Sequence, residues 1–256
     1  MYRAFNGIYK LSLRKKMFES SKMYYGSKKK KIKKKAAIVL SGSGMMDGTE
    51  IHEASACAVH LSRLDIQPKF FSVPCPQTDV IDHYKLSPTN EMRNALVESA
   101  RIARGKICSI NSLTSDEADV LIFPGGFGVA KTLTTFDKDG ANCGVNEEVV
   151  RVVNEFCACR KPMAFTCIAA ILPARIFPGV KVTLGKKGDP KKWPHSEAID
   201  TVSDMGAVVE VKNVDSFTFD KQFLVFTTPA FMYEGTFYQI FEGIGNMIEA
   251  LQKIMP

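Results

Sequence analysis

Cys167 is the residue of this sequence that is best placed for nucleophilic chemistry. It follows a short apolar run, 163–166, and precedes a second apolar run, 168–172, that is typical of the start of a helix. A thiol at the corner between a strand and a helix has the layout of a nucleophile elbow, which lifts the side chain out of the sheet. The N-terminus of the helix offers free N–H groups, which favour a thiolate. The pattern therefore predicts a reactive cysteine, with a buried packing residue as the alternative.

A first strand end supplies an acid for that thiol. Residues 36–40 are a wholly apolar run, as expected of a strand that is buried on both faces of a parallel sheet. Ligands of such sheets bind beyond the carboxyl ends of the strands. Glu53, on the helix that follows, is the candidate group that sets the protonation of Cys167, and Glu50 precedes it by one turn on a similar face. The alternative is that both are solvated first-turn acids.

A second strand end supplies amide donors. Residues 119–123 form another apolar run, and Pro124-Gly125-Gly126 stops it. A glycine lets the backbone approach closely, so the N–H groups of Gly126 and Ile168 are the natural donors to a negative oxygen at the thiol. Taken alone, the Pro-Gly-Gly sequence would be an ordinary tight turn. The expected substrate contacts at these strand ends are Ser41, Glu50 and Gly125.

Strands and helices alternate along the rest of the chain. Apolar periodicity predicts helices from about 50, over 89–104, over 146–159, over 197–205 and over 234–254. Further strands are expected at 69–73, 162–166, 180–184 and 207–211, with a hairpin over 217–226 and loops at 74–88 and 127–144. The alternation predicts an α/β fold with a mostly parallel central sheet and helices on both faces. No linker interrupts residues 36–256, which we interpret as one domain.

The positive charge of the chain is concentrated in its first residues. The sequence has 34 Lys and Arg residues and 27 Asp and Glu residues, and residues 1–35 hold 13 of the former and one of the latter. The remaining 21 basic and 26 acidic residues form a mildly acidic body, which argues against nucleic-acid binding. The leader 1–35 is typical of an organellar presequence followed by a linker, with a disordered tail as the alternative. Its lysine run could also be a polyanion-binding tag.

Cysteine usage and hydropathy exclude several classes. The seven cysteines are scattered and contain no CxxC pair, which favours free thiols in a reducing compartment over a disulfide scaffold or a zinc site. No run of 18 apolar residues is present, so membrane insertion is not expected. We expect neither a cofactor nor a metal. Surface or packing roles are expected for His52, His60, His83 and His195.

Four segments together resemble one protein family. Residues 37–53, 121–131, 164–173 and 227–232 read AIVLSGSGMMDGTEIHE, LIFPGGFGVAK, AFTCIAAILP and TTPAFM. They resemble the ElbB-type branch of the PfpI/class I glutamine amidotransferase-like superfamily, above all its eukaryotic mitochondrial members, over about 36–256. The resemblance implies a flavodoxin-like three-layer sandwich and a location in the mitochondrial matrix, with the cytoplasm as the alternative.

The resemblance also implies a chemistry. Cys167 would be the elbow nucleophile, Glu53 the acid that hydrogen-bonds the thiol, and Gly126 and Ile168 the oxyanion-hole amides. Bacterial relatives are described as weak glyoxalases and other members as deglycases, which implies a cofactor-free enzyme acting on small α-oxoaldehydes or their adducts. True glutamine amidotransferases use Cys-His-Glu, but the late segment 227–232 contains no histidine. Glutaminase activity is therefore not expected.

Three functions stay open at this point. The first is the glyoxalase or deglycase, with a small carbonyl compound as substrate. The second is a non-catalytic mitochondrial protein in which Cys167 senses oxidants or the surface binds a partner. The third is an amide or ester hydrolase, which needs a base near the thiol that the sequence does not supply. Members of the superfamily often dimerise, so a homodimer is a further expectation.

Overall fold

The fold is built on a seven-stranded, mostly parallel sheet. The structure is a computed structural model that describes residues 34–256. The strand order is β10-β11-β7-β6-β1-β2-β5, and β10 is antiparallel to its neighbour. The strands are β1 (Lys34–Leu40), β2 (Ile66–Ser72), β5 (Ile107–Ser109), β6 (Val120–Phe123), β7 (Met163–Thr166), β10 (Thr218–Asp220) and β11 (Val225–Thr228). The predicted leader lies outside the described residues except for its last two, which begin β1.

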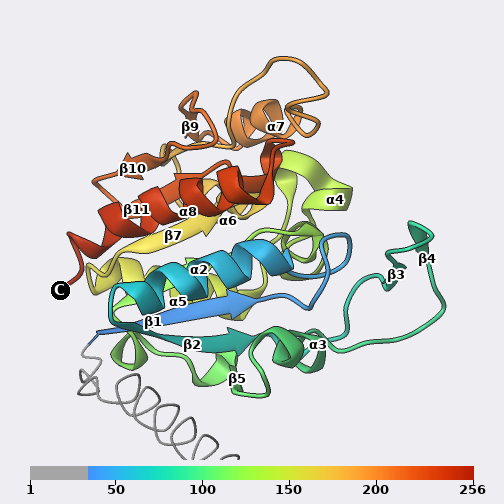
Figure 1. The fold of residues 1–256 in the computed structure, drawn as a ribbon, viewed down its shortest axis with the longest axis horizontal. Helices are drawn as coiled ribbons and strands as arrows, with labels where there is room; N and C mark the ends of the chain where they lie inside the picture. The colour runs from blue at the N-terminus through green and yellow to red at the C-terminus, as the bar shows by residue number, and fades with distance from the viewer. Residues whose placement is uncertain (1–33) are drawn as a thin grey trace, which may run out of the picture. The chain divides into compact units, whose positions relative to one another are not determined.

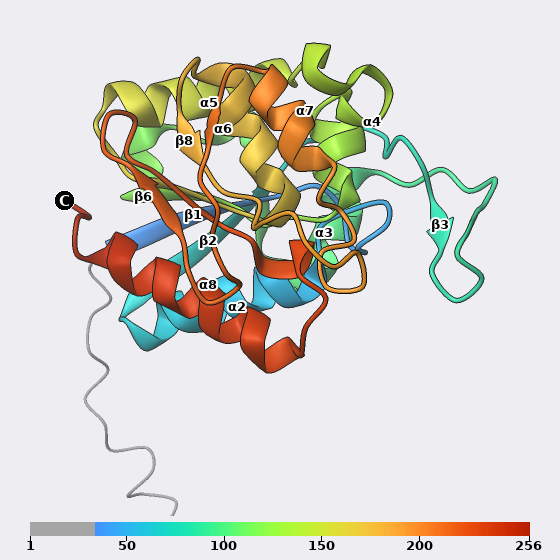
Figure 2. The same ribbon diagram turned by 90° about the horizontal axis from the view of Figure 1, so that it is seen from above.

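Helices cover both faces of this sheet, as Figures 1 and 2 show. On one face α2 (Ile51–Arg63) and α8 (Phe237–Gln252) lie side by side, and α5 (Glu147–Ala158) and α6 (Ile171–Ile176) cover the other. The shorter helices are α3 (Ala95–Ile102), α4 (Phe136–Asp139) and α7 (Ala198–Asp204). This arrangement confirms the predicted α/β three-layer sandwich. Among residues 34–256, no helix is long and apolar enough to cross a lipid bilayer.

The central strand explains why the apolar runs predicted the sheet correctly. β1 pairs with β2 on one side and with β6 on the other, so that Ile38 lies opposite both Phe70 and Ile122. Its residues from Ala36 to Leu40 are buried because helices cover both faces. A strand in this position can keep no polar face. The carboxyl ends of β1, β6 and β7 consequently meet at one edge of the sheet.

The helix predicted over 89–104 is shorter than expected. Asn94 accepts hydrogen bonds from two amides of the first turn, and this cap makes α3 begin at the next residue. Met92, which the apolar spacing of a helix over 89–104 would bury, is 95% exposed. The loop predicted over 74–88 contains a short hairpin, β3 (Ile81–Asp82) and β4 (Ser87–Pro88), that projects from the body (Figure 1).

Two other predicted segments differ from the structure. The loop over 127–144 contains a π-helical turn (Val129–Leu133), α4 and a 3-10 turn (Gly140–Asn142). The strands over 180–184 and 207–211 shrink to β8 (Lys181–Val182) and β9 (Val208–Val209), which pair in a separate two-stranded sheet. β5 was not predicted, because three residues at a sheet edge carry too little pattern.

Candidate active site

Cys167 occupies a strained corner at the end of β7. A 3-10 turn, Cys167–Ala170, joins the strand to α6, and the backbone of Cys167 has a φ of 56°. Residues other than glycine rarely adopt this left-handed conformation, because the β-carbon crowds the following carbonyl. A strained turn from strand to helix is the geometry of a nucleophile elbow. The thiol is 8% exposed, and it forms part of the wall of a cavity of about 440 Å³.

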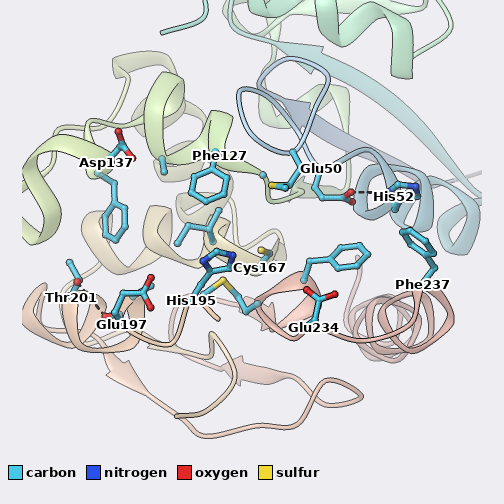
Figure 3. Close-up of a pocket in the computed structure, with 18 residues that line it drawn as sticks. Glu50, His52, Phe127, Asp137, Cys167, His195, Glu197, Thr201, Glu234 and Phe237 are labelled. Carbon is cyan, nitrogen blue, oxygen red and sulfur yellow. Dashed lines mark hydrogen bonds and ion pairs between the residues drawn. The ribbon is translucent and has the colours of Figure 1, made fainter. Parts of the chain in front are cut away.

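That cavity has the size of a small-molecule site. Gly126 and Ile168 line it beside the thiol. Figure 3 shows Glu50 and His52 on one side of Cys167 and His195 on another, and all four line the cavity. The sheet edge predicted from the strand ends therefore borders a real cavity.

The Glu53 carboxyl lies fully buried behind the thiol and is held on several sides. Its Oε2 accepts hydrogen bonds from the Gly125 N–H at 2.8 Å and from the Thr166 hydroxyl, and its Oε1 accepts one from the Phe231 N–H at 3.3 Å. Burial, followed by the charge of Glu50, raises the pKa of Glu53 to about 7, against the opposing effect of these hydrogen bonds. Glu53 therefore exchanges its proton near neutral pH.

The thiol and this carboxyl are directly coupled. The Glu53 carboxyl and the amides of Ile168 and Gly126 are the polar groups that act on the Cys167 thiol. Burial raises the pKa of Cys167 well above its ordinary value, the negative charge of Glu53 adds to this, and the two amides oppose it. A free thiolate beside an ionised Glu53 is therefore unfavourable. At neutral pH the thiol therefore keeps its proton, while the Glu53 carboxyl is close to the midpoint of its own titration.

The two glycines after β6 are required by this close packing. A β-carbon on Gly125 would lie 2.6 Å from the Cys167 Cβ and 2.8 Å from the Glu53 Oε2. One on Gly126, which has a φ of 101°, would lie 2.4 Å from the backbone nitrogen of Glu50. Only a residue without a side chain allows the strand end to touch both the thiol and the carboxyl.

Glu50 takes a different position from the one predicted. It is the N-cap of α2 rather than a residue on its face, and its Oε2 accepts the Glu53 N–H at 2.6 Å. Its Oε1 lies 2.8 Å from the His52 Nδ1. Both acids are buried, so the alternative of solvated first-turn acids is wrong. Of the other expected substrate contacts, Ser41 and Gly125 are absent from the cavity lining; the Ser41 N–H donates instead to the Thr49 Oγ1.

The histidines divide into two groups. His60 is buried between α2 and α8 and His83 lies in an exposed loop, as expected. His52 and His195 line the cavity, which the sequence did not indicate. Within residues 34–256, no histidine hydrogen-bonds the Cys167 sulfur. No three His, Cys, Asp or Glu side chains of this described part converge as metal ligands.

Two supports of Glu53 were missed from the sequence. The Thr166 hydroxyl and the Phe231 N–H both bind its carboxyl. Thr166 carried a signal, because it is the one polar residue of β7 and directly precedes the thiol. Phe231 lies in a 3-10 turn after β11, 178 residues from Glu53 along the chain. A backbone donor at that separation leaves no local pattern in the sequence.

A buried acid, a thiol elbow and glycine amides at one edge of a parallel sheet define an amidotransferase-like α/β protein. No family model matches the chain. It is 47% identical over 220 residues to the "ES1 protein homolog, mitochondrial" of Rattus norvegicus, and the match covers 85% of this chain and 83% of that protein. It is also 47% identical to the human "Glutamine amidotransferase-like class 1 domain-containing protein 3, mitochondrial", over 85% of this chain and 82% of that one. The chain belongs to this family of mitochondrial glutamine amidotransferase-like class 1 domain proteins.

Solved structures agree with this assignment. An isoprenoid biosynthesis protein with an amidotransferase-like domain from Ehrlichia chaffeensis is 32% identical, with a TM-score of 0.77 over 86% of this chain and 99% of that one. DJ-1beta of Drosophila melanogaster shares the fold alone: it is 13% identical, with a TM-score of 0.52 over 87% of this chain and 90% of that one. The predicted family of mitochondrial glutamine amidotransferase-like class 1 domain proteins and the predicted mitochondrial localisation are confirmed. The ElbB-type branch and the matrix as the compartment stay predictions.

Proposed function

We propose that this protein is a cofactor-free enzyme that converts small α-oxoaldehydes, or their adducts, to hydroxy acids. The observation that carries the proposal is the packing of the buried Glu53 carboxyl and the Cys167 side chain against the same glycine, Gly125, at a cavity wall. A carboxyl with a pKa of about 7 is suited to accept and return a proton near neutral pH. The nearby amides of Gly126 and Ile168 are the donors for the oxygen that becomes negative.

The proposed reaction starts with addition of sulfur to the aldehyde carbon. The thiol proton passes to Glu53 as the S–C bond forms, and then to the aldehyde oxygen, which gives a hemithioacetal. Glu53 next removes the proton from this carbon and delivers it to the neighbouring carbonyl carbon through an enediol. The product is a thioester of the 2-hydroxy acid. Water hydrolyses the thioester, which releases the acid and restores the thiol, so that one water is consumed for each aldehyde.

Ser41 and Gly125 have supporting roles in this proposal. Gly125 donates to Glu53, the Ser41 N–H donates to Thr49, and neither residue lines the cavity, so neither needs to touch the substrate. Glu50 orients Glu53 through the backbone and remains the proposed substrate contact of the three.

Two alternatives receive less support from the geometry. Redox-sensor cysteines are accessible and have a lowered pKa, whereas Cys167 is buried and its pKa is raised. A hydrolase or glutaminase of the Cys-His-Glu type needs a histidine on the sulfur, and residues 34–256 supply none there. The homodimer expected from the superfamily stays a prediction.

The test is formation of lactate from methylglyoxal. We expect Cys167→Ala to lower kcat/KM by at least about 10²-fold, while Cys57→Ala, the loss of another buried thiol, retains activity. Glu53→Gln should remove both the activity and the inflection near pH 7 in the pH–rate profile. Equal rates for the wild type and Cys167→Ala would sink the proposal.

A further inference from the structure

The cavity at Cys167 has an unusual charge. Four carboxylate side chains line it, and no Lys or Arg residue does so within the described part of the chain. The four acids are Glu50, Asp137, Glu197 and Glu234. Among the lining groups of residues 34–256, only the imidazoles of His52 and His195 can become positive. A ligand that enters therefore meets a field of negative sign.

Three of these acids have no partner that would neutralise them. Glu50 is engaged by His52 and by the Glu53 N–H. In contrast, the side chains of Asp137, Glu197 and Glu234 form no hydrogen bond or ion pair with any described residue. Figure 3 shows them on separate segments around Cys167, and all three are exposed to solvent. Their charges remain available to a ligand.

Four aromatic side chains also line the cavity. They are the rings of Phe127, Phe136, Phe231 and Phe237. Aromatic faces attract organic cations, and they do so most strongly where water is excluded. The Lys131 ammonium lies 5.8 Å from the Phe127 ring, but it is paired with Asp79 at 2.6 Å and is not part of the lining. Phenylalanine rings and unpaired carboxylates together form a surface complementary to an organic cation.

We infer that the cavity selects carbonyl compounds that carry a positive charge, such as an ammonium or guanidinium group, over compounds that carry a carboxylate. The inference rests on the proposed function only in placing the carbonyl carbon at the Cys167 sulfur. The cationic end then lies between the rings and the acids at Asp137, Glu197 and Glu234. A volume of about 440 Å³ has room for such a group beyond a three-carbon aldehyde. Negatively charged aldehydes are repelled before they reach the thiol.

Charged thiol reagents test the selection without any turnover. Trimethylammonioethyl and sulfonatoethyl methanethiosulfonate differ in charge and share one reaction, in which the thiolate forms a disulfide bond and displaces methanesulfinate. Peptide mass spectrometry gives the rate at each cysteine, and methyl methanethiosulfonate normalises for access. Cys108, which is exposed on β5, is the internal reference. We expect the cation-to-anion rate ratio at Cys167 to exceed that at Cys108 by at least about tenfold.

The variants locate the source of the selection. Asp137→Asn/Glu197→Gln/Glu234→Gln should bring the ratio at Cys167 to within about threefold of that at Cys108. The control Asp116→Asn/Glu147→Gln/Glu249→Gln changes the net charge equally on surfaces outside the cavity lining, and it should keep the wild-type ratio. Equal ratios at the two cysteines of the wild type overturn the inference, as does an equal loss in both triple variants.

A salt series on the wild-type protein keeps the inference testable even if a variant fails to fold. In 1 M salt the screening length falls to about 3 Å, so the ratio at Cys167 must shrink. A ratio that does not change with salt overturns the inference. The two proposals fail separately: charge selection at Cys167 without lactate formation removes only the proposed function, and lactate formation without charge selection removes only this inference.

Discussion

Cys57 and Cys167 are two buried thiols beside the same carboxyl. Cys57 lies one helical turn after Glu53 on α2, and Cys167 lies across from Glu53 at the end of β7. Burial raises the pKa of each thiol, and the charge of Glu53 is the second cause in both. Electrostatics alone would therefore assign the two cysteines the same role.

The backbone and the access to solvent separate them. Cys57 is in a regular helix and fully buried, so the amides around it are used in helical hydrogen bonds. The positive φ of Cys167 opens the chain, so that the Ile168 and Gly126 amides reach its sulfur and the thiol faces a cavity. A raised thiol pKa therefore marks burial, while the amide donors and the cavity distinguish the candidate nucleophile.

The largest expected difference is in reactivity with a neutral reagent. Iodoacetamide should label Cys57 at least about 10³-fold more slowly than Cys167, because Cys57 can react only when the protein unfolds. Peptide mass spectrometry of a labelling time course measures both rates in one sample. In denaturant the two rates should converge. Labelling of native Cys57 as fast as Cys167 would show that access does not separate the two sites.

Glu53, the neighbour that the two thiols share, should make stability depend on pH. Its pKa rises from 4.5 to about 7 on folding, so the folded chain holds this proton more tightly. The resulting stabilisation is complete below pH 4.5 and is lost as the pH rises to about 7, by roughly 3 kcal/mol. Urea unfolding at pH 5 and pH 8 measures the slope. Glu53→Gln should lack this component, whereas Glu147→Gln on the surface should keep it; identical slopes in both variants would contradict the assignment.

Local patterns in the sequence were sufficient to predict the elements that have a regular pattern of apolar residues or a helix-capping residue. The apolar runs at β1, β6 and β7 predicted the parallel sheet, because strands buried on both faces cannot carry polar residues. The helix predicted over 146–159 is α5, and it begins where the Asn146 side chain accepts two amide hydrogen bonds. Short strands at the edges, such as β5 and β8, carry no comparable pattern.

The candidate site was predictable up to its long-range contacts. Cys167, Glu53 and Gly126 each follow a strand end, so the sheet topology brings them together. The Phe231 amide on Glu53 depends on packing between distant segments, as do the acids that line the cavity. The same limit applies to Cys57, whose shared environment with Cys167 becomes visible only when both are placed around Glu53.

The smallest expected effect is the difference in stability between the alanine variant and the glycine variant at each cysteine. This difference is also the most direct measure of how the backbone conformations of the two positions differ. Inside α2, Cys57→Gly should be about 1 kcal/mol less stable than Cys57→Ala, because glycine loses more backbone entropy in a helix. At Cys167 the order should reverse by about 1 kcal/mol, since alanine keeps the strain of a φ of 56° and glycine relieves it.

The urea midpoints of the four variants give both differences. The alanine and glycine variants at one position both lack the thiol, so the loss of the thiol does not contribute to the difference between them. The same sign at both positions would mean that the corner at Cys167 relaxes to an ordinary conformation once its side chain is shortened. The positive φ would then be imposed by the thiol and its contacts with Glu53 and the two amides. Opposite signs mean that the surrounding chain holds the corner in place and presents whatever side chain stands there to the cavity.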